Sequence, residues 1–184
     1  MIYNQDTPFL DQNLKSVERN VHAFATLLKR VKPPVLYIVE AMGGIGLQSL
    51  ELQANFSCRH EAWETNPQCF QQLDRIEGVK AYCSPFPLKQ KFGENTLLVL
   101  DFNLFTLKHK DELRGYFETG AGQIIFTDCA RGKLHLHPQA YGLLSSSWES
   151  YCNTLNEWLG GFGLQIMDFS KAPRSITYFL AALK

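Results

Sequence analysis

Hydrophobic residues recur along this chain with two spacings that alternate. Residues 11–32 carry apolar residues three and four positions apart, at Leu14, Val17, Val21, Phe24, Leu27 and Leu28. This spacing predicts an amphipathic helix, which Pro33 and Pro34 end. Residues 35–40, VLYIVE, form an unbroken apolar run that closes with an acid. Such a run is typical of a strand buried on both faces of a parallel sheet.

The alternation continues to the last residues. Further strands are predicted within residues 58–64, 79–84, 95–103 and 122–130, and further helices within residues 47–54, 66–76, 110–118 and 145–163. Asn66 and Pro67 suit the cap and the first position of one helix. Residues 164–171 and 175–183 show two strand patterns joined by a short turn, which predicts a terminal β-hairpin.

This order of elements predicts an α/β fold. Strands that alternate with helices form a doubly wound, mostly parallel sheet with helices on both faces. The C-terminal hairpin can add only antiparallel pairing, so it inserts an antiparallel strand. With 184 residues and no repeat or linker, we expect one domain over residues 1–184. Residues 1–32 would be an N-terminal helical extension, and residues 35–184 the core.

The composition of the chain bears on which molecules it binds and on where in the cell it is expected. The 18 basic and 18 acidic side chains cancel, so no general attraction to nucleic acid or membrane is expected. The first residues lack the pattern of a signal peptide, and no apolar stretch suits a membrane span. Five scattered cysteines without a CxxC pair are typical of thiols in a reducing cytosol, so we expect a cytoplasmic protein.

A glycine-rich loop, EAMGGIG, follows the first predicted strand at residues 40–46. Ligands of doubly wound sheets bind beyond the carboxyl ends of the strands, and glycine lets the backbone approach them closely. Glu64 ends the next strand, where an acid can bind ribose hydroxyls. We expect Glu40, Gly44, Gly46 and Glu64 to meet at one crevice that holds a nucleotide-like cofactor. The alternative is a tight connection without a ligand, beside a solvated glutamate.

These segments, with LLVLDFN and the terminal hairpin, resemble a class I S-adenosylmethionine (SAM)-dependent methyltransferase. The resemblance covers residues 35–184 and implies a Rossmann-like core, SAM as cofactor and a transferase activity. It implies that Glu40 orients the loop and reaches the methionine amino group of SAM. Gly44 and Gly46 would approach the cofactor through their backbone. Glu64 would bind the ribose hydroxyls, and Thr65 would flank the adenine.

Two positions depart from the pattern of that family. Met42 stands where the family loop has its first glycine, a place where some members carry a bulky apolar residue. Ser84 stands where the family often has an acid that binds the adenine amino group. We keep both residues among the expected cofactor contacts, although a serine does not replace the acid.

The fourth predicted strand ends in Asp101 and Asn103, within DFNLF, where the resemblance places the transferred methyl group. Methyltransferases of nucleic-acid amino groups have an acid or Asn, two prolines and an aromatic residue here. The prolines are missing, and the aromatic residue is displaced to Phe105. Asp101 is our first candidate for the catalytic hydrogen-bond acceptor and a cofactor contact, and Asn103 is the second. The alternative is an Asp that caps the following turn.

The predicted methyl acceptor is an amino group of a base in DNA or RNA, and a small molecule or a protein side chain is the alternative. A polar segment after the fifth strand, DCARGKLHLHP, is expected to edge the substrate cleft. Its Asp128, Cys129, His135 and His137 lack a complete metal-ligand spacing, so no metal is predicted. Arg131 and Lys133 could contact a phosphate or a carboxylate of the substrate.

Two other functions compete with methyl transfer. A methyltransferase fold kept as a binding or scaffold subunit is favoured by the incomplete DFNLF motif and by Ser84. A nicotinamide-dependent oxidoreductase is disfavoured by the hairpin and by the lack of GxGxxG. The N-terminal helix would cover the cofactor or pair with another subunit, and the sequence leaves the oligomeric state open.

Overall fold

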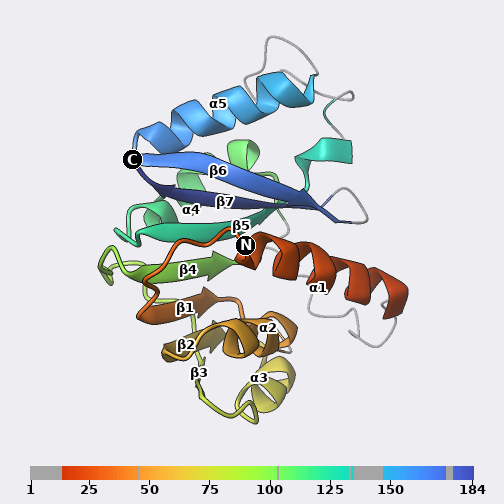
Figure 1. Ribbon diagram of the computed structural model, residues 1–184, viewed down its shortest axis with the longest axis vertical. Helices are drawn as coiled ribbons and strands as arrows, with labels where there is room; N and C mark the ends of the chain where they lie inside the picture. Colours follow the sequence, from red (N-terminus) through yellow and green to blue (C-terminus); the bar gives the residue numbers. More distant parts are fainter. Residues whose placement is uncertain (1–13, 45, 103, 133, 135–146, 173–175) are drawn as a thin grey trace.

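A seven-stranded sheet forms the centre of the protein (Figure 1). It is seen in a computed structural model that describes residues 14–44, 46–102, 104–132, 134, 147–172 and 176–184. The strands are β1 (Tyr37–Ala41), β2 (Arg59–Glu64), β3 (Val79–Cys83), β4 (Thr96–Leu100), β5 (Gln123–Asp128), β6 (Leu164–Lys171) and β7 (Thr177–Leu183). Their order is β3-β2-β1-β4-β5-β7-β6. All pairings are parallel except those of β7 with β5 and β6, which confirms the predicted fold class.

The helices follow the sequence prediction closely. They are α1 (Leu14–Leu28), α2 (Leu47–Asn55), α3 (Pro67–Leu73), α4 (Lys110–Phe117) and α5 (Trp148–Gly160), with the 3₁₀ helices η2 (Thr106–His109) and η3 (Ala130–Gly132). Asn66 caps α3 as expected, because its side-chain oxygen accepts hydrogen bonds from the backbone N–H groups of Gln68 and Cys69. Among the described helices, none has both the length and the apolar character needed to cross a membrane.

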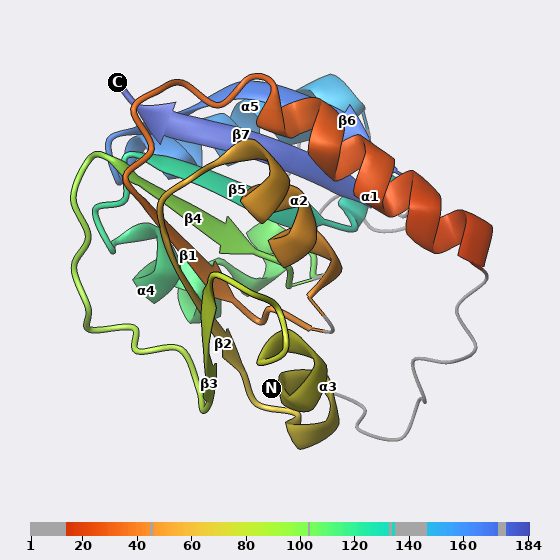
Figure 2. The ribbon, with the colours of Figure 1, turned by 60° about the horizontal axis from the view of Figure 1, so that its bottom comes forward.

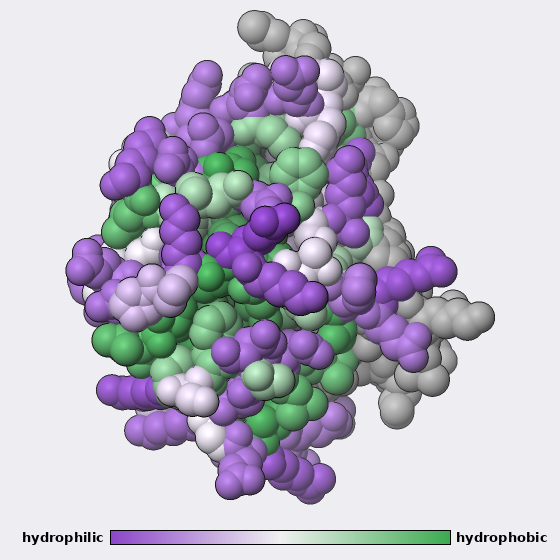
Figure 3. Space-filling view, viewed as in Figure 1, coloured by the Kyte–Doolittle hydropathy of each residue, from purple (hydrophilic) through white to green (hydrophobic). Residues whose placement is uncertain are grey.

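Helices cover both faces of the sheet (Figure 2). On one face, Phe24 and Leu27 of α1 share a buried cluster with Ile38 of β1 and Leu180 of β7. Hydrophilic side chains cover the outward side of α1, as its amphipathic spacing requires (Figure 3). The N-terminal helix is therefore packed onto the sheet and contributes to its core.

The opposite face is covered by α4, α5 and a loop. Phe117 of α4 and Tyr151 of α5 belong to its buried cluster. No helix forms in the connection from β3 to β4, where Phe86 instead packs against Trp63 and Tyr116 with ring centroids 5.4 and 5.5 Å apart. On this face, a loop rather than a helix therefore covers the part of the sheet near Trp63 of β2.

Replacing Asn66 tests whether its side chain stabilises the start of α3. Asn66→Ala removes the acceptor of two orphan N–H groups, so we expect the free energy of unfolding to fall by about 1 kcal/mol. Urea denaturation would measure the loss. Asn66→Ser retains an acceptor and should lose much less; equal losses in both variants would contradict the capping role.

Candidate functional site

The loop between β1 and α2 uses left-handed backbone at three positions. The φ angles are 67° at Met42, 56° at Gly44 and 85° at Gly46. Gly46 closes a turn by donating its N–H to the Gly43 carbonyl at 3.0 Å, and its own carbonyl accepts the Leu50 N–H at 3.0 Å. The loop therefore runs directly into α2, with Gly46 as the residue that precedes the helix.

The two predicted glycines are required for different reasons. A Cβ on Gly46 would collide with the end of the Ile76 side chain, which would have to shift, and the left-handed φ of Gly46 disfavours a larger residue as well. A Cβ on Gly44 would meet no described atom within 4 Å. The space beside Gly44 is therefore open, which is the condition for a ligand to lie against this backbone.

Met42 adopts a backbone conformation that L-residues with long side chains avoid. The left-handed region costs such a residue roughly 1–2 kcal/mol. Its half-buried side chain packs against the cluster beneath α4 and α5, which offsets part of this cost. The position that is glycine in the family thus keeps the glycine backbone geometry in this chain.

Glu64 connects this loop to the end of β2. Its Oε2 accepts the Gly44 N–H at 2.9 Å, and its Oε1 accepts the Asn66 N–H at 2.7 Å. The side chain is nearly buried, with the residue 9% exposed. Each carboxylate oxygen has two lone pairs, so both oxygens retain capacity for a further donor such as a ribose hydroxyl. The structure thus brings Gly44 and Glu64 together at the carboxyl ends of β1 and β2.

Glu40 lies beneath the loop, inside the protein. Its Oε1 is 2.5 Å from the Ser49 hydroxyl of α2 and 2.5 Å from Nε2 of His60 in β2. The other ring nitrogen of His60 lies 2.7 Å from the Gln53 amide. Oε2 of Glu40 is buried and has no hydrogen-bond partner among the described residues. Glu40 therefore ties β1 to its neighbours and still offers one unused acceptor.

Asp101 follows β4 and turns toward α2. Its Oδ2 accepts from the Gln48 amide at 2.9 Å, and the same amide nitrogen lies 3.4 Å from the Tyr178 hydroxyl of β7. Within the described part of the chain, Oδ1 of Asp101 is buried without a partner. Burial raises the pKa of Asp101, while hydrogen bonds from Gln48 and Thr127 oppose the rise.

Sequence reasoning did not select Gln48 or Tyr178. Gln48 carried a weak signal, because it lies in the first turn of the helix that follows the glycine loop. Tyr178 carried none, since only the insertion of β7 beside β5 brings it to this end of the sheet. Burial raises the pKa of Tyr178 as well, so its hydroxyl keeps its proton at neutral pH.

Of the remaining predicted residues, two lie at the carboxyl ends of strands, and the others are not among the residues that the structure describes. Thr65 and Ser84 are exposed, directly after β2 and β3. Asn103, Lys133, His135 and His137 fall outside the described residues. No group of three or more His, Cys, Asp and Glu side chains suited to a metal ion occurs in the described ranges.

Asp128 has a structural role at the end of β5. Its two oxygens accept from the backbone N–H groups of Thr106 and Ala130 and from the Tyr151 hydroxyl, at 2.6 to 2.9 Å. Burial raises the pKa of Asp128, and these hydrogen bonds counter the rise. The carboxylate thereby fixes the turns that follow β4 and β5.

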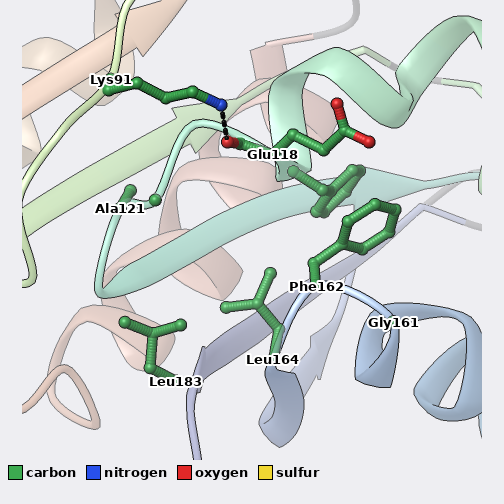
Figure 4. A pocket seen from close by; sticks show the side chains of 9 residues that line it. Lys91, Glu118, Ala121, Gly161, Phe162, Leu164 and Leu183 are labelled. Atoms are coloured by element: carbon green, nitrogen blue, oxygen red, sulfur yellow. Dashed lines mark hydrogen bonds between the residues drawn. The ribbon is translucent and has the colours of Figure 1, made fainter.

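A cavity of about 330 Å³ lies at the other end of the strands, away from the glycine loop (Figure 4). It is bordered by Phe162, Leu164 and Leu183, and by Lys91, whose ammonium donates to the Glu118 carbonyl at 2.6 Å. These residues lie where β6 begins and β7 ends. Because ligands of doubly wound sheets bind at the carboxyl ends of the strands, this cavity is separate from the glycine-loop site.

Comparisons with known proteins agree on the fold. The sequence matches no protein-family model and no curated protein. The structure resembles magnesium protoporphyrin IX methyltransferase from Synechocystis with bound SAH, with a TM-score of 0.62, 13% identity, and 97% of this chain and 88% of that chain covered.

Two other solved structures are similar. A putative S-adenosylmethionine dependent methyltransferase from Listeria monocytogenes has a TM-score of 0.59 at 10% identity, over 91% of this chain and 99% of that one. The ribosomal protein L11 methylase from Lactobacillus delbrueckii subsp. bulgaricus has a TM-score of 0.59 at 15% identity, over 94% of this chain and 80% of that one. The chain therefore has the α/β fold of class I SAM-dependent methyltransferases.

Asp101→Asn tests the buried carboxylate. The amide retains an acceptor for Gln48 and removes a buried charge, so we expect stability at pH 7 to rise by about 1 kcal/mol. The gain should shrink as the pH falls through the raised pKa of Asp101 to the ordinary pKa of about 3.9, because folded wild-type protein gains protons there first.

Urea denaturation of both proteins between pH 4 and pH 8, on the order of one step per pH unit, measures this difference. Asp111→Asn, in the first turn of α4 and exposed, is the matched control and should show no such gain. A stability difference that stays constant with pH would contradict a raised pKa at Asp101.

Proposed function

We propose that this protein is a SAM-dependent methyltransferase whose cofactor binds over the loop of residues 41–46. The observation that carries the proposal is the open space beside Gly44, whose N–H is held by Glu64. A strand-end acid anchored to a glycine backbone, with acceptor capacity left over, fits a ribose lying across the loop. The methyltransferase fold supports this proposal.

Each residue has a stated task in this proposal. Gly44 allows close approach of the cofactor to the backbone, and Gly46, packed against Ile76, holds the loop in its turn. Glu64 accepts from the ribose hydroxyls, and the unpartnered Oε2 of Glu40 accepts from the methionine amino group of SAM. Thr65 and Ser84 flank the adenine from the exposed ends of β2 and β3. These are the positions that the sequence resemblance assigned.

The reacting end of the site is proposed at the end of β4. When bound, SAM supplies an electrophilic methyl group. Asp101 positions the acceptor through its unpartnered Oδ1, and Gln48 holds the other oxygen. Because the pKa of Asp101 is raised, its carboxylate is a better proton acceptor than an ordinary aspartate. Alignment of acceptor and methyl group, rather than covalent catalysis, is the protein's contribution.

The nature of the acceptor is a separate proposal. A base amino group in DNA or RNA was suggested by DFNLF alone, and the inward turn of Asp101 toward Gln48 gives that motif no further support. The similar structures include magnesium protoporphyrin IX methyltransferase, ribosomal protein L11 methylase and plantazolicin methyltransferase. We therefore favour a small molecule or a protein side chain over a nucleic-acid base.

A scaffold function is the second candidate. It is favoured by the engagement of both Glu64 oxygens with backbone N–H groups, which completes the loop without any ligand. Isothermal titration calorimetry with SAM separates the two: folded protein that releases no binding heat supports the scaffold. A parallel titration with NADH, followed by fluorescence, tests the oxidoreductase alternative.

Gly44→Val tests the open space beside the loop. The side chain would occupy the proposed cofactor position, so we expect SAM binding to be lost, with stability reduced by about 1–2 kcal/mol from the left-handed backbone. Gly163→Val is the strain-matched control, because Gly163 has φ 76° and only an ordinary contact with Leu183 at 3.8 Å. Equal SAM affinity in the two variants would refute the proposed position.

Glu64→Gln tests the ribose contact. Losing charge-assisted hydrogen bonds should weaken SAM binding by about tenfold to a hundredfold, as measured by calorimetry. The exposed Glu77→Gln, just after α3, is the control for a change of net charge. If both variants bind SAM as the wild type does, Glu64 has no role in cofactor binding.

A further inference from the structure

Glu40 and His60 form a buried pair beneath the glycine loop. Parallel pairing sets Ile38 of β1 opposite His60 of β2, so Glu40, two residues after Ile38, directs its side chain to the same face of the sheet. The side chains of His60 and Glu40 are 0% and 1% exposed, and Nε2 of His60 lies 2.5 Å from Oε1 of Glu40. Because water does not reach this pair, its protonation is set by the groups that surround it.

Helix α2 determines which ring nitrogen of His60 carries the proton. The amide nitrogen of Gln53 lies 2.7 Å from Nδ1 of His60. The amide oxygen of Gln53 turns toward Gly78, where a Cβ would lie 2.6 Å from it. The amide nitrogen therefore donates to Nδ1, and Nε2 is the protonated nitrogen that donates to Glu40. In this arrangement His60 is a neutral imidazole.

A neutral His60 leaves the negative charge of Glu40 without a countercharge. In the described part of the chain, no lysine or arginine forms an ion pair with Glu40 or Asp101. Burial is the main cause of the raised pKa of Asp101, and the negative charge of Glu40 adds to it. Each of the two acids also has one buried oxygen without a partner among the described residues. Two neighbouring acids with unused acceptor oxygens favour a cationic ligand.

We propose that His60 is a positioning residue for the cofactor. As the neutral imidazole it donates to Oε1 of Glu40, which Ser49 also does, and so Oε2 is left to accept from the amino group of SAM. An imidazolium at this position would supply the countercharge itself and repel that positively charged amino group. This inference rests on the proposed methyltransferase function and specifies how its cofactor site is held.

NMR of the ring nitrogens tests the tautomer of His60 in the protein without a ligand. In ¹⁵N-labelled wild-type protein we expect a proton on Nε2 alone, and we expect both ring signals to shift when SAM is added. 5′-Methylthioadenosine lacks the amino group of SAM and should shift these signals less. A proton on Nδ1, or on both ring nitrogens, overturns the proposal, and this measurement requires no variant.

Calorimetry with the same two ligands separates positioning from general stability. His60→Leu removes the donor to Glu40, so we expect SAM binding to weaken by about tenfold to a hundredfold, while 5′-methylthioadenosine binding stays within about twofold of wild type. His60→Gln keeps an uncharged N–H donor and should retain most of the SAM affinity. His22→Leu, at an exposed position of α1, is the control and should bind both ligands as the wild type does.

The outcomes distinguish this role from the proposed function. Equal weakening of both ligands in His60→Leu shows a merely structural role and overturns the proposal, as does an unchanged SAM affinity. A loss of SAM affinity in His60→Gln as large as in His60→Leu overturns it as well. Wild-type protein that binds neither ligand refutes the proposed function, and the role of His60 with it.

Discussion

The hydrogen bond from the Gly44 N–H to Glu64 is the contact on which the candidate site depends. It joins the loop after β1 to the end of β2, two segments 20 residues apart in the chain. Parallel pairing of β1 with β2 places their carboxyl ends side by side, so one carboxylate can reach the loop backbone. Glu64 also accepts from Asn66, so the same side chain fixes the start of α3.

Buried polar groups continue this arrangement beneath the loop. Glu40 binds Ser49 and His60, and Asp101 binds Gln48, so two acids from adjacent strands hold the first residues of α2. Each acid keeps one buried oxygen without a partner in the described part of the chain. Unsatisfied buried acceptors cost stability, so each of them requires an explanation such as a bound ligand or water. Their position under one loop therefore agrees with a ligand site there.

Most of the fold could be read from spacing and from a few residues with strong local preferences. VLYIVE, NTLLVLDFN and GQIIFTDCA became the buried strands β1, β4 and β5, because continuous apolar runs suit a sheet covered on both faces. The terminal hairpin placed β7 antiparallel between β5 and β6, as two strands joined by a short turn must pair. Helix α1 and strand β4 are shorter than the predicted ranges 11–32 and 95–103. Spacing along the sequence does not fix the terminal residues of an element, because local contacts decide where it ends.

The sequence by itself determined the elements, their order and the meeting of Gly44 with Glu64, because local spacing and parallel pairing fix which strand ends are neighbours. Only the tertiary structure decided where side chains turn. It directed Asp101 toward Gln48, brought Tyr178 beside them and packed α1 onto the sheet. Those outcomes depend on contacts between distant segments, and residue spacing along the chain does not encode them.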